Sequence, residues 1–276
     1  MVYNGKMGTS KSILTRLVGV IFCLGGLFCT LPAPSVAQTE VRTLEFPYFT
    51  LRNRTGSEEP EEFYGGERSD LKAGVCRVEE LDLGVLSPLA DVAPNFLQEE
   101  LLRVQDVREA EPAAILDGLE ATAGPRGPAL YVHGYYIGFE KGCRRAALLQ
   151  QNADLAGRFL WFSWPSDGGA AYYTHDEADL YWSLPDLADT IIELERRFGP
   201  GSVDLIGHSL GARGVVLSLA EVANRHPEMQ LGHVVLLAPD MDFGIFKRVL
   251  PRIRPLAASI TVYAKRDSIL YLSAVN

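Results

Sequence analysis

The stretch Val203-Asp-Leu-Ile-Gly-His-Ser-Leu-Gly-Ala-Arg213 decides the fold of this 276-residue chain. Its first four residues, Val203–Ile206, predict a short buried strand, and residues 212–224 have the pattern of a helix. Between them stands Gly207-His-Ser-Leu-Gly211, a serine with a glycine two positions away on each side. A turn this tight from strand to helix needs small flanking residues, and it holds the serine hydroxyl out at the edge of a sheet. The alternative is a glycine-rich turn that buries an inert serine.

Short apolar segments alternate with helical patterns on both sides of this turn. Strands are expected at residues 129–132, 159–163, 203–206, 234–238 and 260–263, and helices at residues 139–159, 186–198, 212–224 and 243–250. This alternation predicts an α/β fold, with a mostly parallel sheet flanked by helices on both faces. Ligands bind such sheets beyond the carboxyl ends of the strands, so the residues after each strand are the candidates for function.

The segments before residue 128 predict a less regular beginning of the same domain. Strands are expected at residues 46–51 and 74–78, joined by a polar loop over residues 53–70. Helical segments are expected at residues 95–105 and 111–121. We therefore expect one domain over residues 38–276, with N-terminal strands and helices over 38–127 and a nucleophile-bearing core over 128–276.

The N-terminus has the pattern of a targeting segment. Its first 16 residues carry three basic side chains and no acidic one, an apolar run over residues 17–29 follows, and Ser35-Val-Ala37 offers small residues to a signal peptidase. These features predict a signal peptide over residues 1–37, cleaved after Ala37, and hence a periplasmic or secreted protein. The alternative is a single membrane anchor, so contact with a membrane is expected only if the segment stays uncleaved.

Composition and charge exclude several classes of protein. Hydrophobic residues make up 47% of the chain, which rules out a disordered protein. The net charge of −9 falls to −12 when the signal is removed, and no dense basic run is present, so no nucleic-acid partner is expected. The sequence also lacks metal-ligand spacings, a phosphate loop and a dinucleotide motif, so neither a metal nor a cofactor is expected.

Two cysteines remain after removal of the signal, Cys76 and Cys143. An even number of cysteines in an oxidising compartment favours a disulfide. Two separate buried thiols are the alternative, because spacing along the chain does not show proximity in space.

Two backbone amides are candidates for an oxyanion hole. One is that of Leu210, at the start of the helix after Ser209, where the positive end of the helix dipole favours developing negative charge. The other is that of Tyr135, in the His133-Gly134-Tyr135 exit of the strand at residues 129–132. His133 and His208 are expected to be structural hydrogen-bonding residues, and Gly134, Gly207 and Gly211 to support the two turns.

An acidic residue that orients a histidine would complete a Ser–acid–His order along the chain. Asp267 follows the strand at residues 260–263 and is the favoured candidate. Asp240, which follows the strand at residues 234–238 close to Asp242, is the alternative. Each of these aspartates could instead cap the N-terminus of a helix.

The chain resembles the α/β-hydrolase superfamily, specifically its bacterial branch catalogued as domain of unknown function 900. The matching stretches span nearly all of residues 45–276: Phe63-Tyr-Gly-Gly-Glu-Arg-Ser69, Gly74–Val78, Val132-His-Gly-Tyr135 with Phe139, Phe162-Ser-Trp-Pro-Ser166, Tyr173 with Asp176, Gly207–Gly211, Leu237–Asp242 and Tyr263–Ser273. The resemblance implies a serine hydrolase fold with Ser209 as nucleophile and Tyr135 in the oxyanion hole. It implies no particular substrate beyond a small-molecule ester or acyl compound.

The sequence departs from this pattern in its histidines. The family continues with a strand, a loop bearing the general-base histidine and a last helix, whereas none of the five histidines here follows Asp267. His175, expected on a solvated loop, is the only stand-in. We therefore expect an exported serine hydrolase for carboxylic esters or thioesters, at least about 10³-fold slower than an intact relative. The alternative is a non-catalytic envelope protein with this fold, or a truncated gene product.

Overall fold

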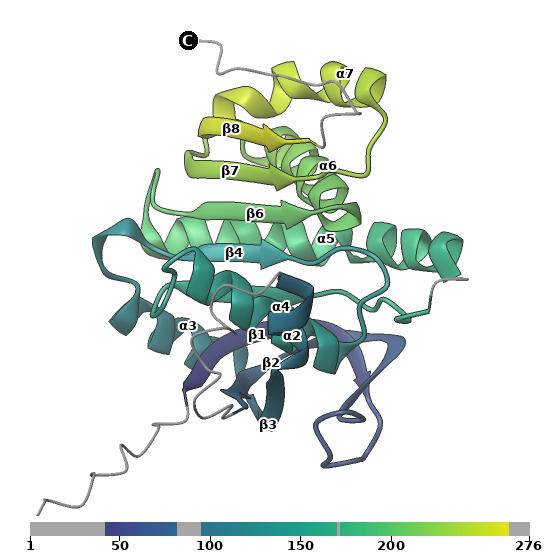
Figure 1. The fold of residues 1–276 in the computed structure, drawn as a ribbon. Helices are drawn as coiled ribbons and strands as arrows, with labels where there is room; N and C mark the ends of the chain where they lie inside the picture. The colour runs from purple at the N-terminus through teal and green to yellow at the C-terminus, as the bar shows by residue number, and fades with distance from the viewer. Residues whose placement is uncertain (1–41, 82–94, 170–171, 265–276) are drawn as a thin grey trace, which may run out of the picture. The chain divides into compact units, whose positions relative to one another are not determined.

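An eight-stranded sheet forms the centre of the structure (Figure 1). The computed structural model describes residues 42–81, 95–169 and 172–264. The strands lie in the order β3-β2-β1-β5-β4-β6-β7-β8. Their bounds are β1 Thr43–Arg54, β2 Tyr64–Glu80, β3 Leu102–Ala110, β4 Ala129–Val132, β5 Phe159–Ser163, β6 Asp204–His208, β7 Leu231–Leu237 and β8 Ala257–Tyr263. The pairings β1–β5, β5–β4, β4–β6, β6–β7 and β7–β8 are parallel. The pairings β1–β2 and β2–β3 are antiparallel.

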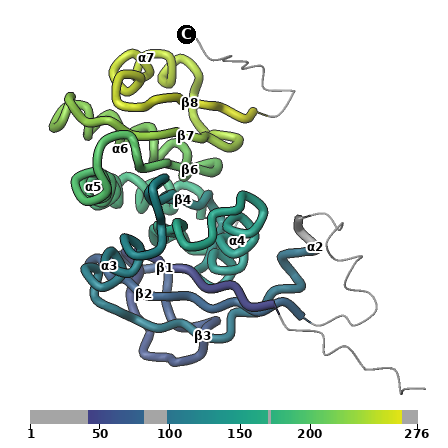
Figure 2. The backbone as a smooth tube through the Cα atoms, turned by 90° about the vertical axis from the view of Figure 1, so that its left-hand side faces the viewer, coloured from purple at the N-terminus to yellow at the C-terminus, as the bar shows by residue number. Residues whose placement is uncertain are grey.

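Helices cover both faces of the sheet, as the sequence predicts. Their bounds are α2 Asn95–Glu100, α3 Pro112–Thr122, α4 Phe139–Asn152, α5 Tyr173–Phe198, α6 Leu210–Arg225 and α7 Phe243–Ile253. In the view along the sheet, α3, α5 and α6 lie on one side and α4 on the other (Figure 2). The apolar core is divided accordingly: side chains from α3, α5, α6 and α7 form one cluster, and those from α4 form a second. Burial of both faces explains why β4 and β5 are apolar at nearly every position.

The register of the parallel strands brings the predicted functional turns together. Val132, the last residue of β4, pairs with Gly207 of β6. His208, the last residue of β6, pairs with Leu237, the last residue of β7. Parallel strands that end in register open their exit loops at the same edge of the sheet. The loops after β4, β6 and β7 are therefore neighbours.

The N-terminal third differs from the sequence prediction in two places. The loop expected over residues 53–70 is shorter than predicted, because β1 continues to Arg54 and β2 begins at Tyr64. The helix expected over residues 95–105 is present only over Asn95–Glu100, because β3 begins at Leu102. A register shift against β2 leaves Gln105 without a partner, so the alternation of buried residues in β3 changes phase, with Leu102 before the shift and Val107 after it. A bulge of this kind hides the period of two that identifies a strand in a sequence.

Helices α4 and α5 also differ from the prediction. The helix expected over residues 139–159 ends at Asn152. The helix expected from residue 186 begins at Tyr173, so His175 lies on a helix and not on a loop. Pro185, directly before the expected start, has no N–H to donate and is unfavourable inside a helix. In the structure the helix continues through Pro185, and buried residues on both sides of it, Leu180 and Leu187, hold it against the sheet.

A disulfide connects strand β2 to helix α4 within the second core cluster. Cys76 of β2 is bonded to Cys143 of α4, with a Cα–Cα distance of 6.5 Å, and both residues are completely buried. The prediction of this pair is confirmed. The predicted signal segment and Asp267 lie outside the described residues. Within the described ranges, every helix is too short or too polar to span a bilayer.

Candidate active site

Ser209 occupies the turn between β6 and α6. Strand β6 ends at His208 and helix α6 begins at Leu210, so the serine is the only residue between them. Its backbone has φ 51° and ψ −119°, a left-handed conformation that is strained for a residue with a side chain. The serine is half-buried. A strained turn of this kind presents its side chain at the sheet edge and points the first amides of the helix toward the same place.

The two glycines of the motif are required by close backbone contacts. A Cβ on Gly207 would come within 2.6 Å of the Cα of Ala212, in the first turn of α6. A Cβ on Gly211 would collide with the carbonyl oxygen of His133, at the exit of β4. Neither backbone can move without displacing a buried element. These contacts give the physical reason for the small residues that the sequence pattern contains.

The exit loop of β4 packs directly against the serine. A Cβ on Gly134 would come within 3.0 Å of the Ser209 Cβ. Tyr135 follows at once, so the loop that carries the predicted second oxyanion donor lies beside the nucleophile. The exit of β7 is held to the same turn by two hydrogen bonds: the N–H of Ser209 donates to Leu237 O at 2.9 Å, and the N–H of Asp240 donates to Ser209 O at 3.1 Å.

Backbone strain is concentrated at this edge of the sheet. Four non-glycine residues of the described chain have positive φ. Three of them follow the strands that meet here: Tyr136 (φ 66°) after β4, Ser209 (φ 51°) after β6 and Ala238 (φ 44°) after β7. Each such conformation costs on the order of 1–3 kcal/mol and persists only where the surroundings impose it. Strain collected at the ends of adjacent strands is typical of a functional site.

His133 is placed as a structural residue. It is fully buried, its ring stacks on Trp164 with centroids 4.9 Å apart, and Nδ1 lies 2.8 Å from the carbonyl oxygen of Gly134. The Trp164 indole in turn donates to the His133 carbonyl at 2.8 Å. Burial, helped by the Arg52 guanidinium, lowers the pKa of His133 to about 3. The ring therefore stays neutral and supports the loop that carries Gly134 and Tyr135. His208 is half-buried, and burial lowers its pKa as well.

Asp176 is a site residue that only the family resemblance indicated. It is fully buried on α5, and its carboxylate accepts hydrogen bonds from the Tyr136 N–H at 3.2 Å, the Ser166 hydroxyl at 2.5 Å and the Asp167 N–H at 2.9 Å. It thus joins the exit loops of β4 and β5. The buried Arg52 supports the same loops through the carbonyl oxygens of Ile137 at 2.6 Å and Ser166 at 2.8 Å.

Asp240 is close to the serine, but its carboxylate is engaged elsewhere. The Tyr173 hydroxyl donates to Asp240 Oδ2 at 2.5 Å, and an Arg213 nitrogen lies 3.4 Å from Oδ1. Tyr173 also stacks edge-on against Tyr135, with ring centroids 5.2 Å apart. Asp242 caps α7, because its side chain accepts from the Ile245 N–H at 2.9 Å. The structure thus places Asp240 as a support of the tyrosines beside the site, and the helix-cap alternative holds for Asp242.

None of the five histidines, all of which lie in the described ranges, is hydrogen-bonded to Ser209. His133 is committed to the β4 loop as above. His175 Nδ1 contacts Asp167 and Asp179, and His226 Nδ1 lies 3.3 Å from Glu228. His233 Nδ1 lies 2.8 Å from the Ser259 hydroxyl, on exposed parts of β7 and β8. A Ser–His pair at the elbow is therefore not formed by the described residues.

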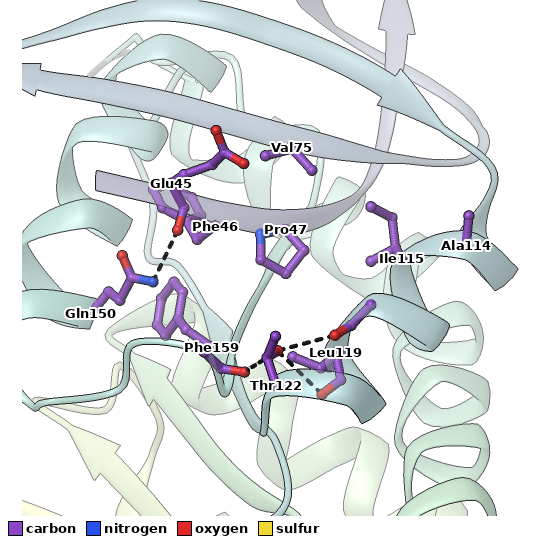
Figure 3. A pocket seen from close by; sticks show the side chains of 12 residues that line it. Glu45, Phe46, Pro47, Val75, Ala114, Ile115, Leu119, Thr122, Gln150 and Phe159 are labelled. Carbon is purple, nitrogen blue, oxygen red and sulfur yellow. Dashed lines mark hydrogen bonds between the residues drawn. The ribbon is translucent and has the colours of Figure 1, made fainter. Parts of the chain in front are cut away.

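Two cavities lie away from the serine hydroxyl. One of about 310 Å³ opens between β1, α3 and the start of β5 (Figure 3). Phe159, the first residue of β5, lines it, so it is at the end of the sheet opposite to Ser209. The second, of about 380 Å³, lies on the α4 side, between Arg145 and His208. His208 lines this second cavity.

Comparisons with known proteins assign the family. No curated protein matches the chain. Among solved structures, a hyperthermophilic esterase from the archaeon Pyrobaculum calidifontis aligns with a TM-score of 0.31 and 14% identity, over 72% of this chain and 44% of that one. A likeness at this level carries no argument about activity. The family described as alpha/beta hydrolase of unknown function (DUF900) matches residues 125–276, a range that contains every element from β4 to β8. The protein belongs to this family of α/β hydrolases of unknown function.

Proposed function

We propose that this protein is a serine hydrolase that acts on carboxylic esters or thioesters, with Ser209 as the nucleophile. The observation that carries the proposal is the conformation of Ser209, a strained and half-exposed serine set between a strand and a helix N-terminus. Gly134 packs against its Cβ, which brings the backbone of Tyr135 next to it. Strain at a nucleophile, with amides on two sides of it, serves acyl transfer.

The chemistry would proceed in two steps. The Ser209 hydroxyl oxygen attacks the acyl carbon and transfers its proton to a base, while the N–H groups of Leu210 and Tyr135 donate to the oxyanion. Collapse of the tetrahedral intermediate expels the alcohol or thiol, which takes up that proton, and leaves an acyl-serine. Water then attacks the acyl-serine in the same way and releases the acid. In this proposal Asp267 is the favoured acid of the triad, and Asp240 is the alternative.

A second candidate function depends on whether Ser209 has a base. Since none of the five histidines is hydrogen-bonded to Ser209, a non-catalytic protein with a hydrolase fold is the alternative proposal. Under this alternative the serine turn would be retained as part of the structure, and the molecule would bind acyl compounds or other envelope components without turning them over. The two candidates differ in one measurable property, the reactivity of the Ser209 hydroxyl.

Labelling of the purified protein with a fluorophosphonate measures that reactivity. The proposal expects one label per chain, located on the peptide that contains Ser209 and absent in Ser209→Ala. Ser259→Ala is the matched control, because Ser259 is the serine of the exposed Ser–His contact and lacks a strained turn and a following helix. Labelling that is lost in Ser259→Ala and kept in Ser209→Ala would refute the elbow. No labelling of the wild-type protein would favour the non-catalytic alternative.

We also propose that the protein is exported. The basic, apolar and small-residue pattern of residues 1–37 supports export, and so does the buried disulfide, because such bonds persist in oxidising compartments. N-terminal sequencing of protein recovered outside the cytoplasm should start at or near Gln38. Recovery of intact chains that begin at Met1 from the cytoplasm would contradict the proposal.

A further inference from the structure

A histidine and two aspartates form a cluster that the proposed hydrolase chemistry does not use. Asp167 lies in the segment after β5, and His175 and Asp179 lie one turn apart on the same face of α5. His175 Nδ1 is 2.8 Å from Asp167 Oδ2 and 3.1 Å from Asp179 Oδ2. The three ligand atoms all lie within 4.8 Å of one another. Residues from two separate elements thus aim a nitrogen and two oxygens at one point.

The buried member of the cluster has an oxygen without a hydrogen-bond donor. Asp179 is 1% exposed. Its Oδ1 accepts from the Arg68 Nε at 2.6 Å, but its Oδ2, which faces His175, accepts no hydrogen bond from the described residues. A buried carboxylate oxygen left without a partner costs on the order of 1–3 kcal/mol or more. A cation bound between Asp179 and His175 would remove this cost.

We propose that Asp167, His175 and Asp179 bind a divalent transition-metal ion of the zinc type. Bonds of about 2.0–2.2 Å to nitrogen and oxygen place neighbouring ligand atoms of a tetrahedron about 3.3–3.6 Å apart, so side-chain shifts of about 0.5 Å from the separations of 2.8 Å and 3.1 Å observed here would admit the ion. An imidazole nitrogen with two carboxylates suits zinc, cobalt or manganese, whereas magnesium and calcium favour sites made of oxygen alone. Three protein ligands leave the fourth position to water.

The charges, hydrogen bonds and packing around the cluster are compatible with such an ion. The two carboxylates offset its charge, and Nδ1 of the neutral imidazole supplies a lone pair. Arg68 Nε donates to Asp179 Oδ1 and so fixes the orientation of the carboxylate. Hydrogen bonds to metal-binding side chains usually have this role. Gly66 allows β2 to lie against Asp167, since a Cβ there would come within 2.6 Å of Asp167 Oδ1. The bound ion would connect the segment after β5 to α5.

Titration of tag-free, chelator-treated protein with CoCl₂ and ZnCl₂ tests the site. We expect one equivalent of Co²⁺ to bind with the visible absorption of a tetrahedral complex, Zn²⁺ to displace it, and the thermal midpoint to rise with Zn²⁺ concentration. His175→Ala and Asp167→Asn should each weaken binding tenfold or more. Both side chains reach solvent, so these variants should fold, whereas Asp179→Asn removes the partner of Arg68 in a buried position.

His226→Ala is the matched control, because His226 is an exposed histidine that also lies beside a carboxylate, that of Glu228. This variant should bind Co²⁺ and Zn²⁺ as tightly as the wild type. Ser209→Ala should also bind as tightly, so the result does not depend on the proposed esterase chemistry. Equal affinity in His175→Ala and wild type would overturn the site. Displacement of Co²⁺ by equimolar Mg²⁺ would overturn the assignment to a transition metal, and absence of binding at 100 times the protein concentration would overturn both.

Discussion

Gly134 lies against Ser209 with no room for a side chain. A methyl group on its Cα would come within 3.0 Å of the Ser209 Cβ and 3.1 Å of the His208 carbonyl oxygen. The exit of β4 and the turn after β6 therefore fix each other, and the position of the Tyr135 amide relative to the serine depends on this contact. Their contact joins the two halves of the proposed oxyanion hole.

Gly134→Ala should impair both the site and the fold. The added methyl must push apart two backbone segments, so we expect a loss of about 1–3 kcal/mol in the free energy of unfolding and at least about tenfold slower labelling of Ser209. Urea unfolding and labelling kinetics measure the two effects. Gly118→Ala is the control: Gly118 is exposed on α3 with nothing near its Cβ position, so this change should stabilise the helix by about 0.5–1 kcal/mol.

Replacing the strained serine by glycine should stabilise the protein. Ser209 has φ 51° and ψ −119°, which glycine adopts at little cost. Relative to Ser209→Ala, which keeps the strain, we expect Ser209→Gly to unfold with a free energy about 1–2 kcal/mol higher. Both variants lack the hydroxyl, so the comparison isolates the backbone. Equal urea midpoints for the two would show that the turn is relaxed.

Turnover by the 276-residue chain should be slow. Because no histidine is hydrogen-bonded to Ser209, the described residues offer its hydroxyl no base, and we expect kcat/KM for short activated esters at least about 10³-fold below that of a family member with a complete triad. Ester hydrolysis should fall further in Ser209→Ala and stay unchanged in His175→Ala. If fast hydrolysis depends on both Ser209 and His175, then His175 leaves its contacts with Asp167 and Asp179 and acts as the base.

Acid should destabilise the protein through His133. Its pKa is lowered to about 3 in the folded state from about 6.5, so the unfolded chain binds the proton more tightly. The neutral His133 ring makes its full contribution to the free energy of unfolding above about pH 6.5. As the pH falls from 6.5 toward 3, this contribution decreases by up to about 1.4 kcal/mol per pH unit.

Unfolding in urea between pH 7 and pH 4.5 measures this slope. His133→Phe, which keeps a ring on Trp164, should be less stable than the wild type at pH 7 but should lose less stability on acidification. His226→Ala, at an exposed position, should keep the wild-type slope. A slope in His133→Phe equal to that of the wild type would show that other groups, such as His208, account for the acid sensitivity.

Reduction of the disulfide should lower the thermal stability. Cys76 and Cys143 are 67 positions apart, and in the chain-entropy model a loop of this length is worth about 4 kcal/mol. For a domain of this size that corresponds to a fall in Tm on the order of 10 °C. Thermal unfolding with and without reductant should show it, and the double variant Cys76→Ser/Cys143→Ser should melt at the lower temperature under both conditions.

Local patterns in the sequence sufficed for the second half of the fold. Strands β4 to β8 are short and largely apolar, the helices between them are amphipathic, and both patterns can be read within a few residues. The glycines around Ser209 predicted the turn because they form a recognisable local pattern, although only the crowding at Gly207 arises from a residue close in sequence, Ala212, whereas that at Gly211 arises from His133. The α/β class followed from these signals, and the family followed from the resemblance of longer stretches of the sequence.

What only the tertiary structure decided depends on residues far apart in the chain. Strand β2 was predicted only over residues 74–78 and β3 was missed, because a bulge and a polar, exposed face erase their alternation; pairing of β2 with β1 and of β3 with β2 compensates for the weak local signal. The buried carboxylate of Asp176 binds two exit loops, and the cluster of Asp167, His175 and Asp179 forms only when α5 packs beside the end of β5. A sequence records which groups are present, whereas their distances are set by how separate elements pack.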